Sequence, residues 1–259
     1  MPAQGKIVYE MKGAIGYLSF ANPDKHNALD QEAWLEVPHA LSRLLELNAK
    51  TIIVSGQGDS FCSGADISEF DTVRKDAETA RIYEQANADA FAAIRHAPVP
   101  TIAKIQGYCL GGGFGLAAAC DIRIATDNAK FSVPAAILGL AYPVDAMADI
   151  VHGVGAQNAK RLLFTAKRHS AEKMKDMGFL DEIVDTQQLD THIKALAHEI
   201  SSLAPLTHRA TKAAIDAALG GKTTREKAVK IGDTTFDSSD YAEGRIAFKQ
   251  KRKPKFTGQ

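Results

Sequence analysis

Short apolar runs alternate with helically spaced apolar positions along the first half of the chain. Two runs, at residues 6–10 and 14–20, predict a pair of strands. From residue 30 to 47 the apolar side chains recur at helical spacing, which predicts an amphipathic helix. Pro38 lies within it and is expected to kink or divide the helix, because proline removes a backbone donor. The β-branched run at residues 51–55 predicts a buried strand.

The alternation continues beyond this strand and gives way to helices in the last third. The further predicted elements are a second amphipathic helix over residues 71–96, strands over 101–106, 121–126 and 130–133, a glycine-rich turn over 107–113, a small buried helix over 114–120, and a short strand or turn at 182–185. Strand–strand–helix units therefore recur, although no sequence repeat of fixed period accompanies them. This order of elements predicts an α/β fold.

Composition narrows the classes of function. Of the 259 residues, 45% are hydrophobic and 24% are charged, the balance of a soluble globular protein. Lys and Arg together number 31, as do Asp and Glu, so no net charge favours nucleic acid or an anionic membrane. No apolar run approaches the ~20 residues that span a bilayer. Cys62, Cys109 and Cys120 are isolated and no signal or transit features open the chain, so we expect a cytoplasmic protein.

Two glycine-rich segments are the strongest candidates for chemistry. Residues 63–66 follow one predicted strand, and residues 107–113 lie between a strand and a helix. Glycine lets a ligand approach the backbone closely, and a helix N-terminus offers oriented N–H groups. If the two turns face one another, they can aim two N–H groups at one oxygen and form an oxyanion hole. From the sequence alone, close packing of strand on helix explains the glycines equally well. Their spacing matches neither of the common nucleotide-binding fingerprints.

The two segments, FCSGADI and IQGYCLGGGFGLAAACDIRIA, resemble the signature segments of the enoyl-CoA hydratase/isomerase (crotonase) family. The resemblance extends from NPDKHNALD near the start, through FSVPAAILGL, to the tail SSDYAEGRIAFKQKRKPKF. It implies a crotonase (ClpP-like) spiral of ββα units over residues 1–195, which holds the CoA and acyl pocket. Residues 196–259 are then a C-terminal helical trimerisation region that also contacts CoA. The implied assembly is a homotrimer or a dimer of trimers.

The resemblance also implies which residues bind an acyl-CoA thioester. The backbone N–H groups of Ala65 and Gly112 fall at the positions that hold the thioester carbonyl. Other positions match family contacts with CoA or substrate, the last two with the CoA of a neighbouring subunit: Lys25, His26, Ala28, Ser63, Asp66, Ile67, Gly111, Phe248 and Lys251. CoA enters as part of the substrate, so no separate cofactor is implied. The eight histidines are scattered without ligand spacing, and no metal is expected.

The chain departs from the family at two positions. Hydratases carry glutamates there, which together activate one water molecule and donate a proton from it. By the resemblance, Gly115 and Ala135 occupy these two positions, and neither side chain can carry a proton. Glu69 is the nearest upstream acid, and we expect it to face solvent on a helix.

Two downstream residues are candidates for a replacement chemistry, Tyr142 and Asp145. Tyr142 matches a tyrosine of methylmalonyl-CoA decarboxylases, although those enzymes carry a histidine where this chain has Ala65. Simple packing over the acyl pocket is the other interpretation of Tyr142. Asp145 is either a base or nucleophile, as in ring-forming members and dehalogenases, or the N-cap of the helix that starts near Val144.

These features favour an acyl-CoA enzyme that stabilises a thioester enolate. Decarboxylation fits best among the reactions, because loss of CO₂ leaves the enolate electrons behind without a general base. A weak acid such as Tyr142 then need only position a carboxylate or protonate carbon. Thioester hydrolysis, C–C cleavage and residual enoyl-CoA hydration remain alternatives. A non-catalytic acyl-CoA-binding protein is the alternative of a different class. Neither a nucleic-acid nor a membrane partner is expected.

Overall fold

The computed structural model describes residues 6–259, and its main feature is a six-stranded sheet in the order β1–β2–β3–β4–β6–β9. The strands are β1 (Ile7–Lys12), β2 (Ile15–Phe20), β3 (Thr51–Gly56), β4 (Thr101–Ile105), β6 (Ile122–Thr126) and β9 (Glu182–Val184). The first two form an antiparallel hairpin, and each later strand joins in parallel. Parallel neighbours require crossover connections, which here are the helices between the strands.

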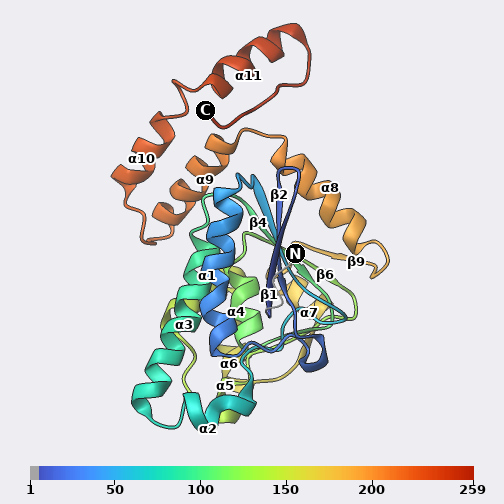
Figure 1. Cartoon of the computed structure of the whole chain (residues 1–259), viewed down its shortest axis with the longest axis vertical. Coiled ribbons are helices and arrows are strands. Elements are labelled where there is room, and N and C mark those ends of the chain that lie inside the picture. Colours follow the sequence, from blue (N-terminus) through green and yellow to red (C-terminus); the bar gives the residue numbers. More distant parts are fainter. Residues whose placement is uncertain (1–5) are drawn as a thin grey trace.

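A second, three-stranded sheet in the order β5–β7–β8 stands beside the main one. Its strands are β5 (Tyr108–Leu110), β7 (Lys130–Ser132) and β8 (His169–Ser170). The chain passes from the first sheet to the second and back through a helix in each turn, for example β4, β5 and then a helix that returns to β6. The predicted α/β spiral of ββα units is therefore confirmed (Figure 1).

Helices fill the connections and the last third of the chain. They are α1 (Gln31–Glu46), α2 (Phe70–Val73), α3 (Ala77–Arg95), α4 (Gly112–Ala119), α5 (Ala135–Leu138), α6 (Val144–Thr165), α7 (Ala171–Asp176), α8 (Leu189–Ser201), α9 (Pro205–Ala218), α10 (Arg225–Asp233) and α11 (Ser239–Gln250), with 3₁₀ turns η1 (Pro23–Lys25) and η2 (Ile67–Glu69). Among residues 6–259, no helix combines the length and apolar character needed to cross a bilayer.

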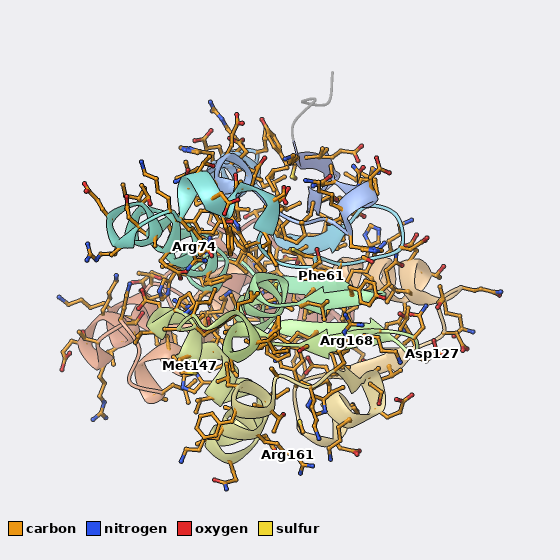
Figure 2. The ribbon with its side chains drawn as sticks, turned by 90° about the horizontal axis from the view of Figure 1, so that it is seen from below. Phe61, Arg74, Asp127, Met147, Arg161 and Arg168 are labelled. Atoms are coloured by element: carbon orange, nitrogen blue, oxygen red, sulfur yellow. The ribbon has the colours of Figure 1, made fainter. Side chains whose placement is uncertain are left out.

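The core lies between the sheets and the helices that pack on them. Phe114 of α4 stacks on Phe179 with ring centroids 4.3 Å apart, and Phe131 of β7 meets Phe179 edge to face. Figure 2 shows Phe61 near the centre of the molecule, whereas charged side chains such as Arg161 and Asp127 project at its rim. Because α4 is apolar on all sides and buried, its N-terminus is held rigidly in the interior.

Three local predictions are corrected. Helix α1 runs without division through Pro38, because the proline removes only its own hydrogen bond while a continuous buried face from Trp34 to Leu44 holds the helix. The second helix is divided into α2 and α3, since Asp76 forms a capping box that starts a new helix. The glycine-rich turn contains a strand, β5, which pairs in parallel with β7.

The expected boundary between core and C-terminal region, at residue 196, lies inside α8. This helix packs on the main sheet through Leu189, Ile193 and Ala197, which belong to one buried cluster with strand residues. Helices α10 and α11 instead project from one end of the molecule, opposite α2 and α5 (Figure 1). Helix α9 (Pro205–Ala218) still contacts the core, because Lys212 donates to the Val99 carbonyl and to Asp121, so the segment that extends beyond the core begins after α9.

Candidate active site

The two glycine-rich turns lie side by side because a short parallel bridge joins Cys62, just before the first turn, to Cys109 of β5 within the second. The Cys62 N–H donates to the Tyr108 carbonyl and the Leu110 N–H to the Cys62 carbonyl, each at 2.9 Å. Burial raises the pKa of the Cys62 thiol to about 12, so this cysteine is an inert part of the scaffold.

Glycine is required where the turns touch. Gly64 has φ 97° and Gly111 has φ 52°, values that disfavour any residue with a side chain. A Cβ on Gly64 would lie 2.8 Å from the Gly112 nitrogen, closer than a real contact allows. A Cβ on Gly113 would lie 2.1 Å from the Cys62 carbonyl oxygen. The two backbones are therefore in direct contact, which supports the expectation that the turns face one another.

The N–H groups of Ala65 and Gly112 border this contact. Gly112 is the first residue of α4, where a helix offers unpaired donors and the positive end of its dipole. In the described part of the chain, neither N–H donates to another backbone or side-chain group, although Leu29 pairs with the residues on both sides of Ala65. Two such donors from adjoining turns are suited to binding one oxygen atom.

Aromatic side chains pack against the second turn. A Cβ on Gly112 would meet the Trp34 ring at 2.7 Å, so this ring lies directly on Gly112. Trp34 packs edge to face on Phe91, and its Nε1–H donates to the Tyr83 hydroxyl at 3.1 Å. The sequence placed Trp34 only on the buried face of a helix. Helical periodicity shows that this face is buried, but it does not indicate which other segment of the chain packs against it.

Tyr142 fills the space beside Gly115. A Cβ on Gly115 would lie 2.6 Å from the Tyr142 hydroxyl oxygen and 2.8 Å from the Phe91 ring. The hydroxyl donates to the Gly111 carbonyl at 2.9 Å. Burial raises the pKa of Tyr142 well above its ordinary value, so the side chain is a neutral hydrogen-bond donor.

Ala135 and Asp145 lie on either side of Tyr142 in the chain. Ala135 is buried and begins α5, directly after Pro134, which lies 3.9 Å from where a Cβ on Gly111 would stand. Asp145 is exposed, and its backbone carbonyl accepts from Arg95 at 3.0 Å. The N-cap interpretation of Asp145 is wrong, because α6 starts one residue before it and Pro143 occupies the cap position.

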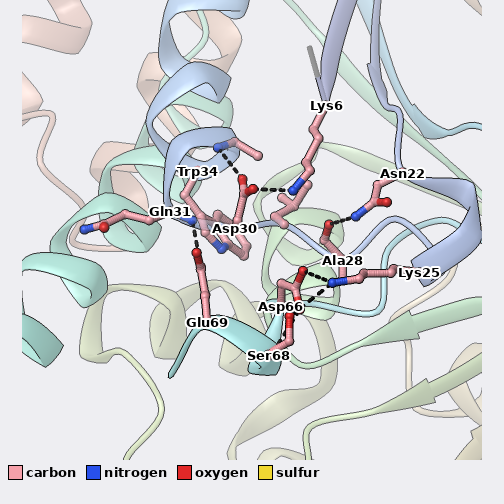
Figure 3. A network of polar contacts seen from close by, with 12 residues as sticks. Lys6, Asn22, Lys25, Ala28, Asp30, Gln31, Trp34, Asp66, Ser68 and Glu69 are labelled. Atoms are coloured by element: carbon pink, nitrogen blue, oxygen red, sulfur yellow. Dashed lines mark hydrogen bonds and ion pairs between the residues drawn. The ribbon is translucent and has the colours of Figure 1, made fainter. Parts of the chain in front are cut away.

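A polar network joins the loop at η1 to the first glycine turn (Figure 3). The Lys25 ammonium donates to Asp66 at 2.7 Å and to the Ser68 hydroxyl at 3.1 Å. These partners, Lys25 first, lower the pKa of Asp66 to about 2. Ser63 also bonds this loop, through its hydroxyl to the Lys25 carbonyl and through its N–H to His26. Four of the expected CoA contacts, Lys25, His26, Ser63 and Asp66, thus lie together at the turn that carries Ala65.

The prediction that Glu69 faces solvent is wrong. Its carboxylate is partly buried and accepts from the Gln31 N–H at the start of α1, at 2.8 Å. Burial raises the pKa of Glu69. The 3₁₀ turn η2 directs the side chain back to α1, where unpaired N–H groups favour a carboxylate.

The remaining predicted contacts divide into two groups. Ala28 is buried beside the network, and its carbonyl accepts from Asn22 at 2.8 Å, whereas Ile67 is exposed at the edge of the first turn. Phe248 and Lys251 lie at the end of α11, and Figure 1 shows this helix at the opposite end of the molecule from α2 and α5. The structure does not bring these two residues to the candidate site of their own chain.

Replacing Asp66 with asparagine is expected to lower the free energy of unfolding by about 1 kcal/mol at pH 7, because Lys25 is half exposed and solvent weakens the pair. A carboxyl whose pKa is depressed in the folded state stabilises the fold above its unfolded pKa, near 3.9. The difference in free energy of unfolding between the wild type and Asp66→Asn should therefore shrink as pH falls from about 4 towards 2. Thermal unfolding of both proteins across this range, at one protein concentration, measures it.

Asp24→Asn is the matched control for this prediction. Asp24 is exposed in the same loop, and among the described residues it forms no ion pair. Its replacement should leave stability unchanged at every pH. A deficit for Asp66→Asn that does not vary with pH would show that the Lys25 pair does not control Asp66.

Comparison with known proteins identifies the family. The family described as enoyl-CoA hydratase/isomerase matches residues 10–259. The chain is 32% identical to the crotonyl-CoA hydratase of Syntrophomonas wolfei over 98% of both proteins. It is 30% identical to the peroxisomal Delta(3,5)-Delta(2,4)-dienoyl-CoA isomerase of Arabidopsis thaliana, over 94% of this chain and 92% of the relative. The crystal structure of an enoyl-CoA hydratase/carnithine racemase from Magnetospirillum magneticum superposes with a TM-score of 0.93 at 32% identity, covering 100% of this chain and 97% of the other.

The chain therefore belongs to the enoyl-CoA hydratase/isomerase family, and it has the crotonase fold. Both expectations from the sequence are confirmed.

Proposed function

We propose that the protein is an acyl-CoA enzyme that stabilises a thioester enolate, and that it decarboxylates a malonyl-type acyl-CoA. The observation that carries the proposal is the pair of adjoining turns, whose N–H groups at Ala65 and Gly112 have no hydrogen-bond partner among residues 6–259. Beside it, the Tyr142 hydroxyl fills the space that a side chain at Gly115 would need. The site thus keeps the donors for an oxyanion but has no room there for a water-activating carboxylate.

Decarboxylation needs only what this site offers. The bond between Cα and the carboxylate breaks, CO₂ leaves, and the bonding electron pair forms the enolate whose charge lies on the thioester oxygen. The N–H groups of Ala65 and Gly112 stabilise that charge, and loss of one donor from an oxyanion hole typically costs about 3–4 kcal/mol. The enolate then takes a proton at Cα from water, which yields the shorter acyl-CoA. No general base acts at any step.

The proposal is tested by incubating the protein separately with methylmalonyl-CoA, malonyl-CoA, acetoacetyl-CoA and crotonyl-CoA and analysing the products by mass spectrometry. We expect loss of CO₂ from a malonyl-type substrate. Free CoA without loss of CO₂ would indicate a thioester hydrolase, and cleavage of the β-keto substrate a C–C lyase. CoA binding with no turnover of any substrate would indicate a non-catalytic protein. Each of these three outcomes contradicts the proposed reaction.

The assembly proposed with this function is a homotrimer or a dimer of trimers. Phe248 is 86% exposed and Phe236 65% exposed in the C-terminal helical region, where an isolated chain leaves them in water. Contact with a second copy would bury them and bring Phe248 and Lys251 to a neighbour's CoA.

Sedimentation is expected to give a mass three or six times that of the 27.8 kDa chain. Burial of exposed apolar side chains between copies is the physical reason. Phe248→Glu should weaken the assembly. Phe164 on α6 is also highly exposed, so Phe164→Glu is the control that shows whether any added surface charge weakens the assembly. A stable wild-type monomer at micromolar concentration would contradict the proposed assembly.

A further inference from the structure

The Tyr142 hydroxyl acts on the peptide group that joins Gly111 to Gly112. It donates to the Gly111 carbonyl at 2.9 Å. That carbonyl and the Gly112 N–H belong to the same planar unit, and in a trans peptide they point in opposite directions. A hydrogen bond at the carbonyl end draws electron density towards oxygen. The N–H at the other end thereby becomes a stronger donor, as in any chain of polarised hydrogen bonds.

The same bond fixes the orientation of this peptide group. Gly111 has φ 52° and ψ −120°, a conformation open to glycine but costly for other residues. Because Gly111 has no side chain to restrict its backbone, hydrogen bonds to this peptide plane help to restrain its rotation. The Gly111 carbonyl also accepts from the Gly115 N–H, at a longer 3.3 Å. Tyr142 supplies the shorter of the two bonds to the carbonyl, and so restrains rotation of the Gly112 N–H.

The geometry argues against an acid role for the hydroxyl. Its proton is directed at the Gly111 carbonyl, and its burial beside Phe91 and Gly115 disfavours the charged phenolate that proton transfer would leave. Tyr142 lies in the connection between α5 and α6, outside both glycine-rich turns, and its hydroxyl holds the second turn through Gly111.

We propose that Tyr142 is a positioning residue, which orients and polarises the Gly112 N–H as an oxyanion donor. This inference rests on the proposed function, because it needs a thioester oxygen at that N–H. Gly115 is then explained as the partner of Tyr142, since any side chain at 115 would displace the hydroxyl.

The test uses 4-(dimethylamino)cinnamoyl-CoA, a thioester whose visible absorption moves to longer wavelength as its carbonyl is polarised. The wild-type protein should bind this probe with a red shift. Tyr142→Phe should bind it with similar affinity but a smaller shift. Its turnover of the proposed substrate should fall about three- to tenfold in kcat with little change in KM or in the shape of the pH profile, as expected for loss of one neutral hydrogen bond. Tyr17→Phe, in β2 and outside the site, should behave as wild type.

The outcomes separate the two proposals. A probe that binds the wild type without a red shift would overturn the proposed oxyanion site. A full red shift in both wild type and Tyr142→Phe would overturn the positioning role alone. If Tyr142→Phe does not fold, trifluorotyrosine at position 142 replaces it, because fluorination makes the hydroxyl a stronger donor while keeping its shape. The red shift should then exceed that of the wild type, and an unchanged or smaller shift would reject the inference.

Discussion

The wild-type protein is expected to hydrate crotonyl-CoA at least ~10²–10⁴-fold more slowly than hydratases of the family, which is the usual contribution of one positioned acid or base. Gly115 and Ala135 stand where those enzymes are expected to carry glutamates, and neither side chain can activate water. The nearest alternatives are poorly suited. The Tyr142 hydroxyl is engaged with Gly111, and Glu69 is held by the start of α1.

A steady-state assay of the wild type with crotonyl-CoA measures this rate. The related crotonyl-CoA hydratase of Syntrophomonas wolfei, assayed under the same conditions, gives the reference. A turnover near ~10² s⁻¹, within the common range of enzymes, would mean that other residues activate water and that the assignment of the two positions is wrong.

Restoring the two glutamates alone should not raise hydration. A Cβ at position 115 already meets the Tyr142 oxygen at 2.6 Å and the Phe91 ring at 2.8 Å. Gly115→Glu with Ala135→Glu is therefore expected to be destabilised and inactive. Adding Tyr142→Ala and Phe91→Ala removes both of these contacts, and only this quadruple variant should gain hydration. A gain by the double variant would show that Tyr142 moves aside readily, contrary to its bond with Gly111.

Gly113→Ala is expected to lower the free energy of unfolding by about 3 kcal/mol or more and to abolish acyl-CoA turnover. The new Cβ would lie 2.1 Å from the Cys62 carbonyl oxygen and 2.8 Å from the carbonyl carbon. Both are backbone atoms, so no side-chain rotation relieves the contact, and overpacking of this kind usually costs 1–3 kcal/mol. The relief must come from separating the two turns, which parts the N–H groups of Ala65 and Gly112.

Gly232→Ala is the matched control. Gly232 lies within α10, its added Cβ would meet no described atom outside its own helix within 4 Å, and it has no left-handed φ. Alanine should stabilise this helix by up to ~1 kcal/mol, because it loses less backbone freedom on folding. Urea unfolding at one protein concentration compares the variants. Equal effects of the two substitutions would refute the close contact between the turns.

Local chemistry explains why most elements were predictable. The β-branched run in β3 and the apolar spacing in α1 each specify one element without help from the rest of the chain. The predictions failed where a neighbour decided the outcome. Packing along one face carries α1 through Pro38, and β5 exists only because β7 lies beside it. Glu69 turns inward because the start of α1, far away in the sequence, offers an unpaired N–H.

The sequence by itself determined the family, the α/β class, and the two glycine turns that carry the candidate donors. Glycines at positive φ and helix starts are local features, so the amino-acid sequence alone can indicate them. Only the tertiary structure decided that the turns touch across the Cys62–Cys109 bridge. It also decided that the Tyr142 hydroxyl occupies the space beside Gly115 and bonds Gly111, thirty-one residues away. Contacts of this kind depend on how separate elements pack, and no periodicity or spacing within either segment encodes them.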